Sequence, residues 1–153
     1  MASNKELGAL FINNYMKNRI TPENIENLKD FQVFVFGSNL AGVHGAGAAA
    51  LARSRGWALN GKGIGFWHMG NEASYAIPTK GMRIEVLSLE WIDYFVYYFI
   101  KDARSKPGWE FLVTEIGCGL AGYTPGEIAP MFEEALNVEN IHLPQRFWDV
   151  LNK

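Results

Sequence analysis

Two glycine-rich segments hold the residues of this sequence that are best suited to chemistry. Residues 37–47 read GSNLAGVHGAG and residues 117–123 read GCGLAGY, and each follows an apolar run and precedes a helical pattern. Glycine lets a ligand touch main-chain N–H groups, and a helix N-terminus adds a partial positive charge. Two such segments facing each other would suit a diphosphate. Small residues after a strand can also serve only to let a helix pack closely on a sheet.

Asn39 and His44 are the side chains of the first segment that could act on a ligand. The Asn39 amide can both donate to and accept from a ribose hydroxyl, although asparagine also forms turns. His44 can serve as a general base or bind phosphate, and the alternative is a capping or surface histidine. The loop residues that we expect to line a ligand site are Gly37, Ser38, Asn39, Gly42, Gly45, Ala46, Gly47, Gly117, Cys118, Gly119, Leu120, Ala121, Gly122 and Tyr123.

Cys118, Glu115 and Lys80 each allow two interpretations. A thiol before a helix can have a lowered pKa, but the sequence shows no base beside Cys118, so we expect a small loop residue. Glu115 can point into the pocket or away from it, and Lys80 can neutralise a phosphate or remain exposed. The sequence has no G-x-x-x-x-G-K-[ST] motif, and its three histidines lack metal-ligand spacing. We therefore predict neither a metal nor a cofactor.

Length and charge limit the class of protein. A chain of 153 residues suits one domain, predicted over residues 1–153. The net charge of −2, from 14 basic and 16 acidic residues, offers no basic face for duplex nucleic acid. The single cysteine forms no internal disulfide, and we find neither a signal-peptide pattern nor an apolar run near the ~20 residues of a membrane span. We expect a cytoplasmic domain with no membrane partner, and the oligomeric state stays open.

Apolar runs alternate with helical patterns along the chain. Strands are expected at 31–36, 74–77 (ended by Pro78), 110–116 and 140–143. Helices are expected at 4–18, after Thr21–Pro22, from the first glycine-rich segment to about 55, between 88 and 106, and from a Thr124–Glu127 capping box. Pro130 lies about one turn inside the last of these, so that helix is expected either to kink there or to start late. Residues 56–72 show no clear pattern. The elements predict a three-layer α/β/α sandwich with a mixed, largely parallel sheet.

The sheet places the two glycine-rich segments. In such folds ligands bind beyond the carboxyl ends of the strands, so we expect segments 37–47 and 117–123 to lie side by side. Aromatic residues make up 14% of the chain. Those of the long helix are expected in the core or on a helix-packing face, and Tyr94, Tyr97 and Tyr98 could form an interface.

The sequence resembles the macro domain family in two stretches. These are VFVFGSNLAGVHGAGAA, at 33–49, and VTEIGCGLAGYTPGEIAPMF, at 113–132. Macro domains bind ADP-ribose and its derivatives, and some hydrolyse them. The resemblance spans about residues 20–140, rests on short motifs, and implies a macro-like fold in a divergent member.

The resemblance also implies roles for individual residues. Asn39 matches the second asparagine of the family's Asn-Ala-Asn segment, and residues 45–47 match its glycine turn. Gly117, Gly119 and Gly122 match the turn that wraps the diphosphate. The adjoining Tyr123 falls where an aromatic ring can stack on the distal ribose.

Three positions depart from the family pattern. Phe36 replaces the first asparagine, and Ala49 stands where hydrolytic members often carry an aspartate that works on the distal ribose. The acidic residue that recognises adenine has no secure match, and Asp30 is the nearest candidate. The resemblance therefore supports a nucleotide-diphosphate pocket better than it supports removal of ADP-ribose.

Three functional hypotheses follow. The first is a domain that binds an ADP-ribose-type nucleotide diphosphate and, if catalytic, hydrolyses or dephosphorylates it at the distal ribose, with Asn39 positioning a hydroxyl and His44 activating water. The second is a non-catalytic reader or sequestering module for a nucleotide signal or an ADP-ribosylated partner. The third and weakest is an interaction protein whose glycine loops only pack.

Overall fold

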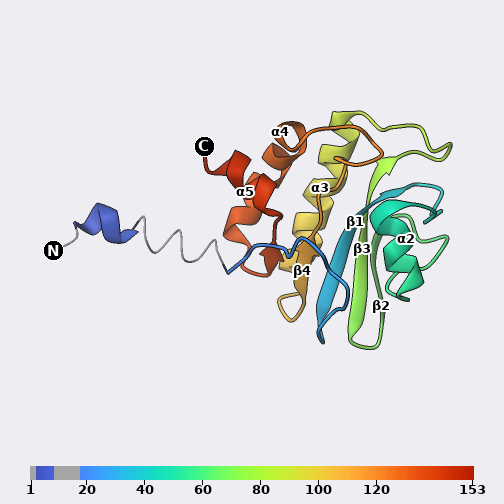
Figure 1. The fold of residues 1–153 in the computed structure, drawn as a ribbon, viewed down its shortest axis with the longest axis horizontal. Helices are drawn as coiled ribbons and strands as arrows, with labels where there is room; N and C mark the ends of the chain where they lie inside the picture. Colours follow the sequence, from blue (N-terminus) through green and yellow to red (C-terminus); the bar gives the residue numbers. More distant parts are fainter. Residues whose placement is uncertain (1–2, 9–17) are drawn as a thin grey trace.

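A five-stranded mixed sheet forms the middle layer of the fold (Figure 1). The computed structural model describes residues 3–8 and 18–153. The strands run in the order β2 (Gly65–Met69), β3 (Glu72–Lys80), β1 (Gln32–Asn39), β4 (Glu110–Val113) and β5 (Ile141–His142). β2 is antiparallel to β3, and the other neighbours are parallel. The predicted largely parallel sheet is confirmed.

Helices cover both faces of this sheet (Figure 1). Helix α2 (Gly47–Ser54) packs on one face. The other face carries α3 (Leu89–Arg104), the short α4 (Pro125–Ile128), the 3₁₀ helix η1 (Ala129–Asn137) and α5 (Gln145–Leu151). The three-layer α/β/α sandwich predicted from the sequence is therefore confirmed.

The apolar run of β1 contributes side chains to the hydrophobic cores on both faces of the sheet. Successive side chains of a strand point to opposite faces. Val33 and Val35 accordingly pack in the core beneath α3, η1 and α5, whereas Phe34 and Phe36 pack beneath α2. All four are buried, and burying a side chain of this size contributes about 1.5–3 kcal/mol. An apolar residue at every position is what a strand covered on both faces requires.

The helix caps predicted at Ser88 and Thr124 are present in the structure. The Ser88 hydroxyl accepts a hydrogen bond from the Trp91 N–H at the start of α3, at 3.3 Å. Thr124 and Glu127 form the expected capping box of α4. The chain then tightens into η1, with Pro130 in its first turn, which confirms the predicted interruption of this helix.

Two local predictions were wrong. β3 continues through Pro78 to Lys80. The pairing with β2 ends at Ala76, so the β2 side of Pro78 is a free strand edge, where proline is tolerated. Residues 21–22 form no helix, since the Thr21 N–H donates to the Leu143 carbonyl at 2.9 Å and ties this segment to the end of β5.

The remaining differences concern strand lengths and the amino-terminal helix. β2 falls in residues 56–72, where no clear pattern was found, and β4 and β5 are shorter than expected. The helix expected at 4–18 is present at 4–8, and residues 9–17 lie outside the described part.

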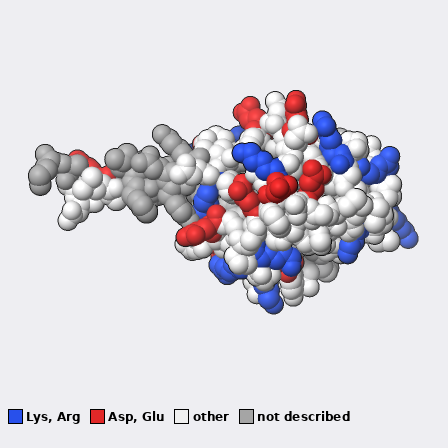
Figure 2. Space-filling view, turned by 90° about the horizontal axis from the view of Figure 1, so that it is seen from below, with Lys and Arg blue, Asp and Glu red and all other residues white. Residues whose placement is uncertain are grey.

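Surface charge and hydropathy complete the description. Acidic and basic side chains are interspersed on the face shown in Figure 2. Within residues 3–8 and 18–153, no helix has the length and apolar character needed to cross a membrane.

Candidate functional site

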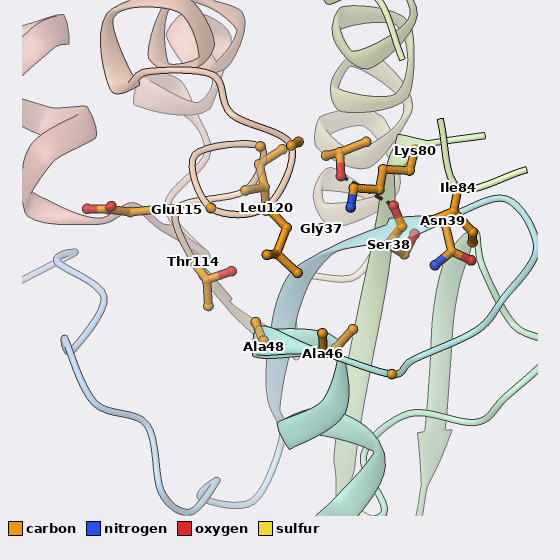
Figure 3. Close-up of a pocket in the computed structure, with 18 of the residues that line it drawn as sticks. Gly37, Ser38, Asn39, Ala46, Ala48, Lys80, Ile84, Thr114, Glu115 and Leu120 are labelled. Atoms are coloured by element: carbon orange, nitrogen blue, oxygen red, sulfur yellow. Dashed lines mark hydrogen bonds between the residues drawn. The ribbon is translucent and has the colours of Figure 1, made fainter. Parts of the chain in front are cut away.

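A pocket of about 470 Å³ opens between the two glycine-rich segments (Figure 3). It lies at the carboxyl ends of β1 and β4, which are adjacent parallel strands. Ten of the residues predicted to bind a ligand line it: Gly37, Ser38, Asn39, Gly45, Ala46, Gly47, Gly117, Gly119, Leu120 and Ala121. The segments therefore lie side by side, as the fold class predicted.

Gly37 lies where the first glycine-rich segment approaches both Thr79 and Gly117. A Cβ atom at this position would lie 3.3 Å from the Thr79 Oγ1 and 3.6 Å from the Gly117 nitrogen. A side chain beyond that Cβ would push the segments apart, so glycine is what allows the ends of β1, β3 and β4 to close around one pocket.

The Asn39 side chain folds the first segment into a closed loop. Its Nδ2 donates to the Val43 carbonyl at 2.7 Å, and its Oδ1 accepts from the Val43 N–H at 2.9 Å. The Gly42 N–H also donates to the Asn39 carbonyl at 3.0 Å. Asn39 lines the pocket as well. The side-chain NH2 of Asn39 can donate a second hydrogen bond, and its side-chain oxygen can accept a second one. Asn39 can therefore hold the loop and bind a ligand at the same time.

The backbone around Gly61 and Gly63 packs against this loop and holds it by hydrogen bonds. The Gly61 N–H donates to the Gly42 carbonyl at 2.8 Å, and the Ser38 hydroxyl donates to the Gly63 carbonyl at 2.5 Å. A Cβ on Gly42 would lie 2.7 Å from Gly61, and one on Gly63 would lie 2.3 Å from the Asn39 carbonyl oxygen. These glycines are required by backbone contact between the two segments.

The second glycine-rich segment combines a fixed base with an open tip. Gly117 has a φ of 74°, and a Cβ there would lie 3.0 Å from the Ile128 Cδ1. A Cβ on Gly119 would meet no atom within 4 Å. The neighbouring Leu120 is 71% exposed, and its side chain points into the pocket (Figure 3). The tip can therefore accept a ligand group beside Gly119.

Lys80 supplies the charge at the pocket. Its amine, at the end of β3, is directed into the space between the two loops (Figure 3). Glu115 also lines the pocket, but its carboxylate points away and pairs with Arg146 at 3.0 Å. The Thr114 hydroxyl donates to the Val35 carbonyl at 2.7 Å. Of the two interpretations of Lys80, this geometry favours the one in which it faces an anion.

The start of α2 adds to this positive character. Ala46 is its N-cap, and residues 46–49 line the pocket. The first turn of α2 carries no acidic side chain, and the N-cap side chain makes no hydrogen bond. The partial positive charge of the helix terminus therefore faces the pocket without a carboxylate to neutralise it.

His44 does not reach the pocket. Its side chain is buried against the Phe36 ring, at 5.2 Å between ring centroids, and its Nε2 lies 3.0 Å from the Leu59 carbonyl oxygen. The residue turns inward because the loop must cover the apolar layer under α2. The geometry favours a packing role over the base role predicted for His44.

Four other predicted ligand residues also lie outside the pocket lining: Gly42, Cys118, Gly122 and Tyr123. The Tyr123 hydroxyl donates to the Leu87 carbonyl at 2.6 Å, and its ring packs against the core. Cys118 is half-buried and packs against the same core, and burial together with the Glu115 carboxylate raises its thiol pKa to about 11. Cys118 is therefore a neutral packing residue at physiological pH.

Several lining residues were missed by the sequence analysis, among them Thr79, Ile84 and Thr114. Thr79 is brought in because β3, not a more distant strand, neighbours β1. The sequence did carry a signal that Thr79 could belong to the site. A glycine follows the SYAIPTK run, as one follows each of the strands predicted at 31–36 and 110–116. Ile84, with a φ of 64°, comes from the loop after β3, and no local pattern pointed to it.

A second groove, of about 660 Å³, adjoins the pocket and shares Ala48, Thr114 and Glu115 with it. It runs between residues 21–26, the outer side of α2 and residues 144–146. Thr21 lines it, and the Thr21 hydroxyl oxygen is buried with no hydrogen-bond partner among residues 3–8 and 18–153. Asp30, the candidate for adenine recognition, lines neither cavity.

In the part of the chain that the structure describes, no three His, Cys, Asp or Glu side chains come together in a group that could hold a metal ion.

Comparison with known proteins supports the fold. The solved structure of a macrodomain protein from Streptomyces coelicolor is similar with a TM-score of 0.53 at 15% identity, over 78% of this chain and 90% of that one. A protein of unknown function from Bacteroides thetaiotaomicron is similar with a TM-score of 0.58 at 15% identity, over 77% and 88%. No protein-family model matches the sequence, and no curated protein matches it significantly. The chain thus has a macrodomain-like fold.

Proposed function

We propose that this chain binds an ADP-ribose-type nucleotide diphosphate. The observation that carries the proposal is the convergence of two glycine loops and the first turn of α2 on one pocket, with the Lys80 amine directed into it. Backbone N–H groups, a helix terminus and a lysine are the groups that bind phosphates in proteins. The fold similarity to a macrodomain protein points to the same class of ligand.

The diphosphate would lie between residues 37–47 and 117–123. The open side of Gly119 leaves room for it, and Lys80 would neutralise part of its charge. Glu115 would not repel it, because its carboxylate is turned toward Arg146.

The nucleoside end of the ligand would occupy the adjoining groove. The two cavities share lining residues, so one extended molecule can fill both. Leu51 and Phe34 give this groove an apolar wall.

The distal ribose would lie near Asn39, where any hydrolysis or dephosphorylation would take place. Asn39 can still accept or donate one hydrogen bond to a ribose hydroxyl while holding Val43. Activation of water would need a group other than the buried His44. We therefore propose binding as the function and hydrolysis at the distal ribose as its catalytic extension.

A non-catalytic reader or sequestering module is the second candidate. One specific observation favours it: among the described residues lining the pocket, Glu115 is the sole carboxylate, and it points away from the space between the loops. Ala49 likewise supplies no acid at the start of α2. A turnover assay separates the candidates, since ADP-ribose-derivative cleavage that is lost in Asn39→Ala would exclude the module.

The proposal is tested by calorimetric titration with ADP-ribose, ADP, AMP and NAD. The proposed site predicts that ADP-ribose binds more tightly than AMP, because only the former places a diphosphate and a distal ribose between the loops. Equal affinity for all four, or heat with none, would count against the site.

A further inference from the structure

Helix α3 presents an unusual aromatic face to solvent. Trp91, Tyr94, Tyr97 and Tyr98 are 56%, 49%, 55% and 41% exposed. Buried residues of the same helix, among them Ile92, Val96 and Phe99, hold its opposite side in the core. Aromatic side chains of this kind are enriched at protein interfaces, and contiguous exposed apolar patches mark interaction sites.

The exposed rings form one connected patch. The Tyr94 ring packs edge-on against Tyr98 at 4.9 Å and against Trp91 at 5.8 Å between centroids, and Tyr97 packs against Tyr98 at 5.4 Å. The rings are therefore ordered against one another before any partner arrives. A surface that is ordered in advance loses less conformational entropy on binding.

Charged residues of opposite sign lie at the two ends of the exposed face of α3, so this face can complement a second copy of itself. Residues 90, 94, 97 and 101 share one stripe of the helix, and they read Glu, Tyr, Tyr and Lys. The stripe is symmetric about the point between Phe95 and Val96. Two antiparallel copies that cross at this point would place Glu90 of each beside Lys101 of the other.

We propose that two copies of this chain associate through their α3 helices, packed antiparallel about a two-fold axis. A two-fold interface joins the same surface of both subunits, so the surface must complement itself. The stripe on α3 meets this condition: Tyr94 faces Tyr97 of the second copy, and the acidic start of one helix faces the basic end of the other. Opposed helix dipoles favour the same arrangement.

The four exposed rings supply about two thirds of the area that a weak dimer needs, and the charged residues beside them must supply the rest. A fully buried aromatic side chain removes roughly 150–250 Å², so four half-exposed rings contribute about 400 Å² per copy and about 800 Å² per dimer. Specific interfaces begin near about 1,200 Å² in total. The exposed charged residues at both ends of the helix, Glu90, Asp93, Lys101 and Arg104, add contact area beyond the rings. No α3 residue lines the nucleotide pocket, so the dimer leaves that site open.

Sedimentation velocity of the full chain tests the proposal. The wild-type protein should show a concentration-dependent monomer–dimer equilibrium. Glu90→Lys and Lys101→Glu should each raise the dissociation constant at least about tenfold, because like charges then face each other twice per dimer. The double variant E90K/K101E reverses both charges and should dimerise to within about threefold of wild type.

Two controls make the result specific. Glu133→Lys reverses an exposed charge on η1 and should leave the equilibrium unchanged. Replacing both Tyr94 and Tyr97 by alanine should abolish the dimer while the circular dichroism spectrum stays that of a folded chain. A wild-type protein that is monomeric at every concentration, or a double charge reversal as weak as its single variants, would overturn the proposal.

Discussion

The side chain of Asn39 and the backbone of Val43 exchange two hydrogen bonds, of 2.7 and 2.9 Å, that close the first glycine loop. This contact fixes the loop at the position where β1 ends and the pocket begins. Asn39 also lines the pocket, so one residue shapes the site and can contact a ligand.

Asn39→Ala should therefore affect both stability and affinity. Two hydrogen bonds disappear from an exposed loop, and we expect the free energy of unfolding to fall by about 1–2 kcal/mol. The dissociation constant for ADP-ribose should rise at least about tenfold. Urea denaturation and calorimetry measure the two quantities. Asn27→Ala, at an exposed position, is the control, and wild-type affinity in Asn39→Ala would show that the amide has no role in the site.

Gly119 and Gly117 should respond differently to the same substitution. Gly119→Val adds a side chain into open space and should leave the melting temperature close to that of wild type while blocking the pocket. Gly117→Val adds a side chain against Ile128 at a residue whose φ is 74°. We expect it to lower the free energy of unfolding by about 1–3 kcal/mol. Differential scanning calorimetry distinguishes them, and equal melting temperatures would contradict the geometry.

Lys80→Met should weaken ligand binding through loss of charge. A hydrogen bond to a charged group contributes about 1.5–3 kcal/mol, so the dissociation constant for ADP-ribose should rise roughly tenfold to a hundredfold. The dependence of affinity on salt should also become shallower. Lys29→Met, at an exposed position outside both cavities, should change neither quantity. An unchanged salt dependence in Lys80→Met would place the phosphates elsewhere.

His44 should prove to be a packing residue. His44→Leu keeps an apolar group against Phe36 and should leave ADP-ribose affinity, and any turnover, within about twofold of wild type. His44→Ala leaves a cavity and should cost about 2–4 kcal/mol of stability. Turnover in wild type that vanishes in a folded His44→Leu protein would restore the base role.

Cys118 provides a test that depends on pH. Burial, and then the Glu115 carboxylate, raise the pKa of its thiol to about 11. At pH 7 about one thiol in ten thousand is then ionised, so alkylation by iodoacetamide should be much slower than that of a free thiol. Rapid alkylation of the folded protein near neutral pH would contradict this environment.

The raised pKa also has a consequence for stability. The folded state holds the thiol proton more tightly than the unfolded chain, whose thiol ionises near about 8.5. The resulting stabilisation is fully present below that pH and is lost as pH rises from there through about 11. Cys118→Ala should remove this part of the alkaline decline in unfolding free energy, which denaturation at several pH values would measure.

Much of the fold could be predicted because its signals are local. The apolar run of β1 and the caps at Ser88 and Thr124 each depend on a few neighbouring residues. The two glycine loops could be placed together because carboxyl ends of neighbouring parallel strands meet at one edge of a sheet.

What the sequence could not indicate has tertiary causes. The glycines at 42 and 63 are required by contacts with Gly61 and Asn39, which are distant from them in the sequence. His44 turns inward because an apolar layer lies beneath its loop, and a lone histidine carries no sign of that. Thr21 pairs with the end of β5 instead of starting a helix.

Calorimetric titration of ADP-ribose into wild type and Gly119→Val, side by side, tests the central claim most directly. The account predicts micromolar binding to the wild-type chain and none to a Gly119→Val protein with an unchanged melting temperature. Equal binding by both proteins, or no binding by a folded wild-type chain, would contradict a diphosphate site between residues 37–47 and 117–123.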